Sequence, residues 1–413
     1  MPRPTSSLHA LSHRNFRLLW TGQLISVSGT MMQTAGILWH VSLLAPPGRK
    51  GLALGLVGLV RVLPVVIFSL LGGVLADVMD RRRQMFLTQT LMAVLAGVLA
   101  WLTFRGLTVL WPIYLLAALT ATAGAFDSPA RQSLIPNLVP RSELPNAIGL
   151  NTIVFQAGSV VGPSLAGLTI AALSVGWVYA INALSFLAVL AGLALMRGVS
   201  SAPAEGASDI SLGAAAEGLR FVFASPMIRS TMLLDFFATF FSSATALLPM
   251  FAQDVLRVGA HGYGLLYAAP SVGALLASVV MVRILDRLDR RGATLLSAVT
   301  VYGAATVAFG VSRAFWLTFA CLAVTGAADN ISTVLRNVIR QLETPDHLRG
   351  RMTGVNMVFL LGGPQLGELE AGLVANWWGP VLSVVTGGIG SLVVTAWIAA
   401  STPALRRYRR QRT

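Results

Sequence analysis

Residues 72–83 read GGVLADVMDRRR, a glycine-rich apolar run that leads into two aspartates and three consecutive arginines. The charged part recurs at residues 284–291 as ILDRLDRR. Each copy follows a long apolar segment and places a pair of aspartates before a pair of arginines. This repetition predicts two related halves, with each charged stretch at the point where a helix leaves the membrane.

The composition indicates an integral membrane protein. Of the 413 residues, 55% are hydrophobic and 11% are charged, and the mean hydropathy is +0.73. A soluble domain has about 25% charged residues. Apolar runs of about 20 residues, long enough to span a bilayer as helices, recur along the chain. We expect twelve transmembrane helices, at residues 16–42, 51–76, 85–104, 109–129, 147–172, 176–196, 227–255, 262–285, 292–312, 314–333, 350–376 and 379–401.

The longest polar stretch, residues 198–229, separates the first six expected helices from the last six. We therefore expect an all-α membrane protein with four parts: a six-helix bundle (1–197), a cytoplasmic linker (198–226), a second six-helix bundle (227–401) and a basic tail (402–413). Apolar residues at helical spacing in the linker predict a short amphipathic helix at the membrane surface. They are Leu212, Ala216, Leu219 and Phe223.

The net charge of +14 is explained by topology. Most basic residues, Arg336 and Arg340 among them, fall in segments that lie on the same side as the N-terminus if all twelve helices cross. The positive-inside rule then places both termini in the cytoplasm. No soluble domain is left to carry a groove for nucleic acid, so we expect no nucleic-acid partner.

Enzymatic and metal chemistry have no sequence support. The single cysteine, Cys321, excludes a disulfide framework, and the five histidines show no metal-ligand spacing. The chain also lacks a nucleotide-binding loop and any arrangement typical of nucleophilic catalysis. We expect no enzyme activity, no metal and no cofactor.

The stretch at residues 72–83 resembles the loop motif of the major facilitator superfamily. The residues that fit the motif are Gly73, Asp77, Arg81 and Arg82. Val78 replaces a basic residue of the motif, and Asp80 replaces its second glycine. The resemblance extends over nearly the whole chain and implies two pseudo-symmetric six-helix bundles.

In that superfamily these residues are taken to latch the two bundles at the cytoplasmic face. The second copy contributes Asp286 and Arg290 to the expected latch, but has Val282 where the first copy has Gly73. We expect the second copy to be the weaker latch. The alternative is that the arginines, Arg83 above all, only fix topology.

Residues 149–167, GLNTIVFQAGSVVGPSLAG, are similar to the motif of the superfamily's proton-coupled exporters. The matching residues are Gly149, Gly158, Gly162, Pro163 and Gly167. Ala166 departs from the motif but is also small. The alternative interpretation, small residues for tight helix packing around a proline, predicts the same local structure.

Three further stretches resemble a bacterial exporter branch that includes the enterobactin exporter and macrolide efflux proteins. They are LRFVFASP (219–226), YGLLYAAPSVGALL (263–276) and RGRMTGVN (349–356). This resemblance implies proton-driven export of a siderophore-like or drug-like small molecule by alternating access. The alternatives are a proton-coupled uptake symporter and a non-transporting scaffold or sensor. We expect a monomer in the bacterial cytoplasmic membrane.

Three aspartates in or near the expected spans are candidates for proton coupling, because charge is costly in hydrocarbon. Asp235 is the first, since it has no basic neighbour on its own helix and burial favours the protonated form. The alternative interpretation of Asp235 is a hydrogen bond that holds two helices together. Asp127 is a second candidate, although a salt bridge with Arg131 four residues later is the simpler interpretation. Asp329 has a similar place in the second half.

Arg61, Glu368 and Glu370 predict an outer gate. Arg61 lies roughly 24 Å and Glu368 roughly 26 Å from the expected cytoplasmic face at 1.5 Å per residue. We expect Arg61 to pair with one of the two glutamates across the pathway. An alternative role for Arg61 is to anchor an anionic substrate.

Four polar or aromatic residues are candidates for lining the substrate cavity, and they are Gln33, Trp39, Asn151 and Asn356. For Gln33 and Trp39 the competing interpretations are a buried polar contact and an interfacial tryptophan.

Overall fold

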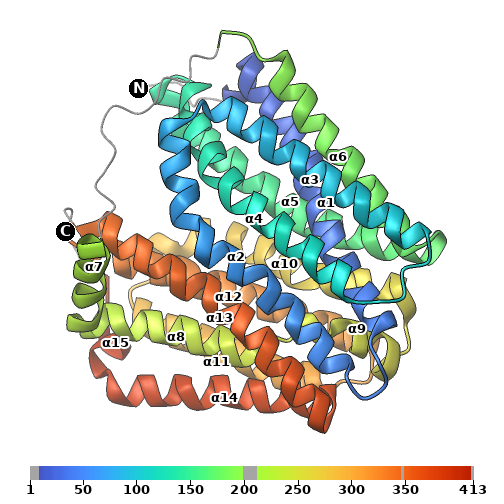
Figure 1. Ribbon diagram of the computed structural model, residues 1–413. Coiled ribbons are helices and arrows are strands. Elements are labelled where there is room, and N and C mark those ends of the chain that lie inside the picture. The colour runs from blue at the N-terminus through green and yellow to red at the C-terminus, as the bar shows by residue number, and fades with distance from the viewer. Residues whose placement is uncertain (1–8, 199–211, 346–347, 411–413) are drawn as a thin grey trace. The chain divides into compact units, whose positions relative to one another are not determined.

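The computed structural model describes residues 9–198, 212–345 and 348–410, and these form helices without any strand (Figure 1). The chain divides into two compact units. The first unit comprises Met1–Leu44 and Val60–Ala207, and the second comprises Ala45–Leu59 and Ser208–Thr413. The expected all-α fold is confirmed.

The first unit contains six long helices, of which α2 begins in the second unit. Their bounds are α1 (Arg14–Leu44), α2 (Lys50–Val78), α3 (Arg81–Phe104), α4 (Trp111–Leu134), α5 (Leu144–Ala172) and α6 (Val175–Leu195). Short 3₁₀ turns at His9–Ser12, Ile135–Asn137 and Arg141–Glu143 flank them.

The second unit begins with the linker helix α7 (Leu212–Ala224). The expected seventh span is broken into α8 (Pro226–Ser242), a 3₁₀ turn (Thr245–Leu247), α9 (Leu248–Met250) and a π-helical turn (Phe251–Val255). The remaining helices are α10 (Gly259–Ile284), α11 (Arg291–Val311), α12 (Phe315–Glu343), α13 (Arg349–Trp378), α14 (Pro380–Ser401) and α15 (Pro403–Arg407), with a 3₁₀ turn at Leu285–Arg287.

The two halves that repeat in sequence also pack their helices in the same pattern. In the first unit α1 packs against α5 and α6, and α3 packs against α4 and α6. In the second unit α8 packs against α13 and α14, and α11 packs against α12 and α14. The helices that pair in one unit are thus the counterparts of those that pair in the other.

The expected spans match the long helices to within five residues at each end, except for the broken seventh span and the end of α12. We expected this helix to end at residue 333, but it continues to Glu343. Leu335 and Ile339 are fully buried along the added turns, and so are Arg336 and Arg340. The two arginines therefore belong to the helix, and their placement on the cytoplasmic side stays a prediction. Within the described parts, nine helical segments are long and apolar enough to cross a membrane.

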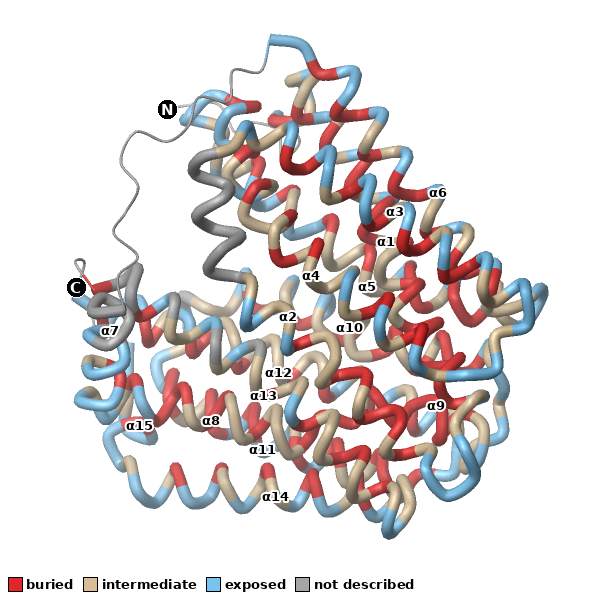
Figure 2. The backbone as a smooth tube through the Cα atoms, viewed as in Figure 1, coloured by how far each residue is buried: buried red, intermediate tan, exposed pale blue. Residues whose placement is uncertain are grey.

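Helix α14 buries small residues and turns large apolar ones outward. On α14 the buried positions include Ser383, Gly387 and Ser391, whereas Val393 and Trp397 are exposed. Figure 2 shows buried and exposed stretches alternating along this helix. Small residues inside and large apolar residues outside are typical of helices that pack closely in lipid.

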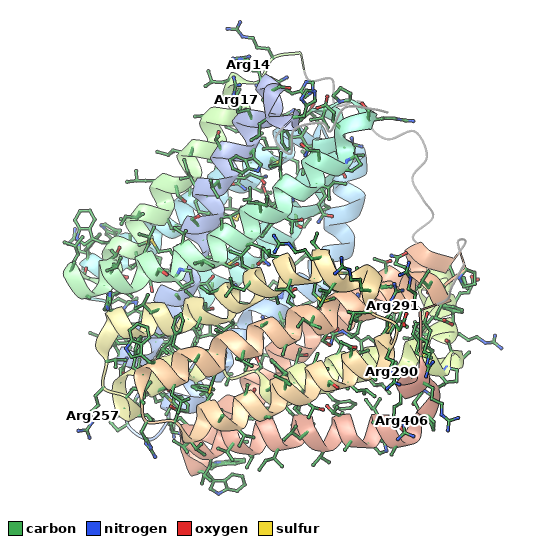
Figure 3. The ribbon with its side chains drawn as sticks, turned by 180° about the vertical axis from the view of Figure 1, so that it is seen from behind. Arg14, Arg17, Arg257, Arg290, Arg291 and Arg406 are labelled. Carbon is green, nitrogen blue, oxygen red and sulfur yellow. The ribbon has the colours of Figure 1, made fainter. Side chains whose placement is uncertain are left out.

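Basic residues lie at both ends of the second unit, more of them at one end. Arg290, Arg291 and Arg406 gather at one end, and Arg257 lies at the other (Figure 3). This separation is the one that the topology prediction requires, and the placement of the first group in the cytoplasm stays a prediction. The helices α7 and α15 lie at the same end as that group (Figure 1).

The linker helix α7 contacts α8 through a residue outside the expected membrane-facing set. Val222 is buried against Ile228 and Met232 of α8. Leu219 and Phe223, which belong to the expected apolar face, are 45% and 47% exposed. An exposed apolar face on a helix at the end of the bundle is suited to the membrane surface.

The first part of α2 is held in the second unit. The Lys50 Nζ atom lies 3.0 Å from Asp254 Oδ2 and donates a hydrogen bond of 2.7 Å to Gln253 Oε1. At the next residue, a Cβ atom on Gly51 would come within 2.6 Å of the Gly372 carbonyl oxygen on α13. Only glycine permits so close a contact between the two helix backbones.

Candidate functional site

Asp235 of α8 and Arg336 of α12 form an ion pair inside the second unit. Arg336 Nη2 lies 2.7 Å from Asp235 Oδ1, and the two side chains are 1% and 2% exposed, respectively. Among the described residues neither Asp235 oxygen has an aligned hydrogen-bond donor, so the contact is electrostatic. Burying such a pair costs several kcal/mol of desolvation per ion. A charge pair kept at that cost is a functional candidate.

Arg336 is oriented by its own helix. Its guanidinium donates hydrogen bonds of 2.9 Å to Ser332 Oγ and 2.8 Å to Thr333 Oγ1. Both hydroxyls lie one turn nearer the N-terminus of α12, the direction in which helical side chains lean. The arginine is therefore held facing α8.

Asp329 is a second carboxylate beside the same arginine. It lies two turns before Arg336 on α12, and its Oδ1 atom is 3.8 Å from Arg336 Nη2. Its side chain is 46% exposed, in contrast to the enclosed Asp235. One guanidinium thus faces two carboxylates, one in close contact and one held loosely.

Asp329 lines a cavity of about 210 Å³ within the second unit. Tyr302, Thr306 and Thr325 contribute polar groups to its wall, and Phe309 and Leu322 contribute apolar surface. Asp329 belongs both to this wall and to the group of charges around Arg336. The cavity and the charged residues therefore form one continuous site.

Arg340, one turn beyond Arg336, is hydrogen-bonded to two neutral side chains. Its guanidinium donates hydrogen bonds to the side-chain oxygens of Asn337 and of Asn356 on α13. Arg340 is 3% exposed. Asn356, a predicted cavity residue, thus binds an arginine and joins α12 to α13.

In the first unit Asp127 is buried without an ion pair among the described residues. It is 3% exposed and accepts hydrogen bonds from Thr88 Oγ1 at 2.9 Å and Gln89 Nε2 at 3.0 Å, both on α3. The guanidinium carbon of Arg131 lies 4.9 Å from the ring centre of Phe155 instead. The simple salt bridge between Asp127 and Arg131 is therefore wrong, because each side chain has a partner on another helix.

The other predicted cavity residues lie within the first unit. Gln33 is 4% exposed and accepts a hydrogen bond of 2.8 Å from Asn182 Nδ2, which joins α1 to α6. Trp39 is 7% exposed, and Asn151 is half-buried on α5. Their role in substrate binding stays a prediction.

Some glycines of the predicted α5 motif lie in close contact with α1, and Gly149 does not. A Cβ atom on Gly158 would lie 2.8 Å from Val27 Cγ1, and one on Gly162 would lie 2.5 Å from the Ser28 carbonyl oxygen, both on α1. Gly149 has open space around it. Pro163 and Gly167 are buried in the same helix.

The same packing recurs in the second unit. Gly363, the counterpart of Gly158, lies against α8, where a Cβ atom would be 3.1 Å from the Phe236 carbonyl oxygen. Glycines at equivalent positions of α5 and α13 thus allow close contact with a neighbouring helix. A role of the motif in transport stays a prediction.

The sequence pattern of the family described as transmembrane secretion effector matches residues 5–409 of this chain. The chain belongs to this family. The match confirms the resemblance to the major facilitator superfamily, and the relatives below are transporters. The protein is therefore a multi-pass membrane transporter and not an enzyme.

The chain is also similar in sequence to enterobactin exporters. The enterobactin exporter EntS of Salmonella typhimurium (strain LT2) is 27% identical over 409 residues, which cover 96% of this chain and 94% of the relative. EntS of Escherichia coli O1:K1 is 25% identical over 407 residues, with the same coverage.

Solved transporters share the fold of this family member. A bacterial homologue of the human lysosomal transporter Spinster has a TM-score of 0.72 at 15% identity and covers 100% of both chains. A bacterial homologue of the iron transporter ferroportin has a TM-score of 0.67 at 17% identity, covering 94% of this chain and 99% of the other.

The loop arginines expected from the superfamily motif cap helices of the first unit. Arg81 donates a hydrogen bond of 3.2 Å to the Ser133 carbonyl near the end of α4, and Arg82 donates one of 3.2 Å to the Ala194 carbonyl near the end of α6. Basic groups at helix C-termini are favourable because of the helix dipole.

Of the other residues in the two charged stretches, the structure describes Asp80 and Arg290. Asp80 caps α3, and its Oδ1 accepts a hydrogen bond of 2.8 Å from the Arg83 backbone. Arg290 is exposed. Gly73 and the side chains of Asp77 and Asp286 lie outside the part that the structure describes. A latch between the bundles stays a prediction.

The outer gate also stays a prediction, because Arg61 belongs to the first unit and both glutamates belong to the second. Within the second unit Glu368 packs against α2, since a Cβ atom on Gly58 would lie 2.7 Å from Glu368 Oε2. Glu370 is half-buried on α13.

Sequence reasoning missed Arg336, Arg340 and the hydroxyl groups of the cavity. Arg336 and Arg340 lie four residues apart in VLRNVIRQLE, where Leu335 and Ile339 have the same spacing. That spacing is a helical signal for residues 334–343. Nothing local in the sequence indicates that the arginines of this helix point inward.

Proposed function

We propose that this transporter exports a small molecule from the cytoplasm in exchange for protons, by alternating access. The observation that carries the proposal is the buried Asp235–Arg336 pair with Asp329 beside it on a polar cavity. Export is supported by the relatives named as enterobactin exporters, which favour a siderophore-like substrate. Drug-like molecules are the second substrate class.

The proton acts through the partners of Arg336. When Asp329 is protonated, Arg336 remains paired with Asp235 alone. When Asp329 is ionised, two carboxylates compete for one guanidinium, and the close contact with α8 weakens. Asp235 and Arg336 lie on different helices, so this competition changes how tightly α8 and α12 are held together.

The proposal includes a monomer in the bacterial cytoplasmic membrane with both termini in the cytoplasm. Asp127 is the alternative proton site, because it is buried with neutral partners. The latch residues and the pair formed by Arg61 with Glu368 or Glu370 would control the two ends of the pathway.

The proposal is tested with inside-out membrane vesicles and labelled enterobactin. We expect accumulation only when the vesicle interior is acidic, because substrate then enters as protons leave. Asp235→Asn and Asp329→Asn should reduce accumulation to the level of vesicles without the protein. Asp127→Asn serves as the comparison in the first unit.

Other outcomes would redirect the assignment. Accumulation driven by an alkaline interior would contradict export by antiport and favour uptake. Full loss in Asp127→Asn with retention in both second-unit variants would place the proton site in the first unit.

A further inference from the structure

The cavity beside Asp329 presents hydrogen-bond acceptors. The hydroxyls of Thr239, Thr306 and Thr325 line it, and each donates its hydrogen to a carbonyl of its own helix, at 2.7, 2.9 and 2.7 Å. A hydroxyl has one hydrogen to donate and two lone pairs. These three groups therefore have only lone pairs left for a ligand in the cavity.

Ser242 adds an unsatisfied polar atom to the same wall. Its side chain is 7% exposed, and its Oγ atom has no hydrogen-bond partner among the described residues. A buried hydroxyl without a hydrogen-bond partner is unfavourable, because it has lost its contacts with water. This arrangement is expected where a bound molecule completes the hydrogen bonding.

Among the described residues that line the cavity, the charge is negative. Asp329 is the ionisable acid of the lining, and the described lining residues include no lysine, arginine or histidine. Arg336 is 3.8 Å from Asp329 but 2.7 Å from Asp235, which leaves Asp329 the less neutralised of the two acids. The lining therefore favours a cationic hydrogen-bond donor.

The size and the apolar wall favour an organic cation. A hard metal ion such as Ca²⁺ needs about six to eight oxygens at about 2.4 Å. The cavity instead has a volume of about 210 Å³, with Phe309 and Leu322 among its lining residues. This space suits an ammonium group attached to a compact apolar or aromatic body.

We propose that this cavity binds a protonated amine of the transported molecule, with Asp329 as its counter-ion and the threonine hydroxyls as acceptors. The inference rests on the proposed function and, of its two substrate classes, favours drug-like molecules that carry an amine. Proton and amine compete for one carboxylate, so binding of either one displaces the other.

The test measures equilibrium binding of labelled tyramine to the purified full-length protein in detergent. The competitors 4-ethylphenol and 3-(4-hydroxyphenyl)propionate resemble tyramine in shape but are neutral and anionic. We expect tyramine to bind saturably. Each competitor should need at least about tenfold higher concentration than unlabelled tyramine to displace the labelled compound. Asp329→Asn should abolish binding.

A matched pair of variants on α11 tests the acceptors. Thr306→Val removes an acceptor from the cavity, whereas Thr300→Val removes a hydroxyl with the same intrahelical bond, of 2.9 Å, from outside the lining. We expect about tenfold weaker binding for the first and no change for the second.

Absence of saturable tyramine binding, equal competition by 4-ethylphenol, or unchanged binding in Asp329→Asn would overturn the inference. Because binding is measured without a pH gradient, it can fail while proton-driven export is retained. Conversely, amine binding without gradient-driven transport would contradict the proposed function alone.

Discussion

Replacing Arg336 with methionine should destabilise the protein by about 3–5 kcal/mol and abolish transport, because it leaves the buried Asp235 without a counter-charge. Asp329 lies beside the same position, so the variant has two neighbouring carboxylates and no cation between them. The free energy of unfolding in detergent measures the first effect, and vesicle accumulation measures the second.

Asp235→Asn should lower the free energy of unfolding by less than Arg336→Met does. In Asp235→Asn the guanidinium can turn to Asp329, which is already 3.8 Å away. The double variant Asp235→Asn with Arg336→Met should recover most of the lost stability without recovering transport, because it removes both buried charges together.

Arg283→Met, at an exposed site on α10, is the control and should change stability by no more than about 0.5 kcal/mol. Equal destabilisation by Arg336→Met and Arg283→Met would show that the buried pair contributes nothing specific. Recovery of transport in the double variant would show that these charges take no part in coupling.

Gly162→Ala should destabilise the first unit by about 1–3 kcal/mol or more, since the new methyl group would press on the backbone of α1. Its Cβ atom would lie 2.5 Å from the Ser28 carbonyl oxygen and 2.8 Å from the Met32 amide nitrogen. Backbone atoms in a packed helix cannot move aside as a side chain can. Thermal unfolding and the amount of folded protein in the membrane are the measurements.

Gly149→Ala is the matched control on the same helix. No atom lies within 4 Å of its added Cβ, so alanine should be neutral or stabilising by up to about 1 kcal/mol. Equal losses in the two variants would show that α5 tolerates no added methyl group, and equal tolerance would contradict the close contact with α1. A transport defect in Gly149→Ala without loss of stability would give this motif position a role beyond packing.

Much of the fold follows from local sequence. Apolar runs of span length predicted the long helices, because hydropathy and helix rise are properties of each segment alone. The spacing of Gly158 and Gly162 predicted close packing, and both lie against α1. The end of α12 was missed, because Arg336 and Arg340 resemble loop charges when hydropathy is the only guide.

Only part of the candidate site could be predicted from the sequence. Asp235 stands out in the sequence because it is a charge within an apolar run. Its partner Arg336 lies four helices later in the chain, and only packing of α12 near α8 brings the two together. For Asp127 the local four-residue spacing favoured Arg131, whereas Thr88 and Gln89 of α3 are its partners.

The sequence by itself determined that this chain is a duplicated helical membrane protein and that certain glycines and aspartates are unusual for their surroundings. The tertiary structure decided which charges pair, which hydroxyls point their lone pairs into a cavity, and which arginines are buried. The reason is physical: hydropathy and helical periodicity are local, whereas the direction of a side chain across a bundle depends on helices far apart in the chain.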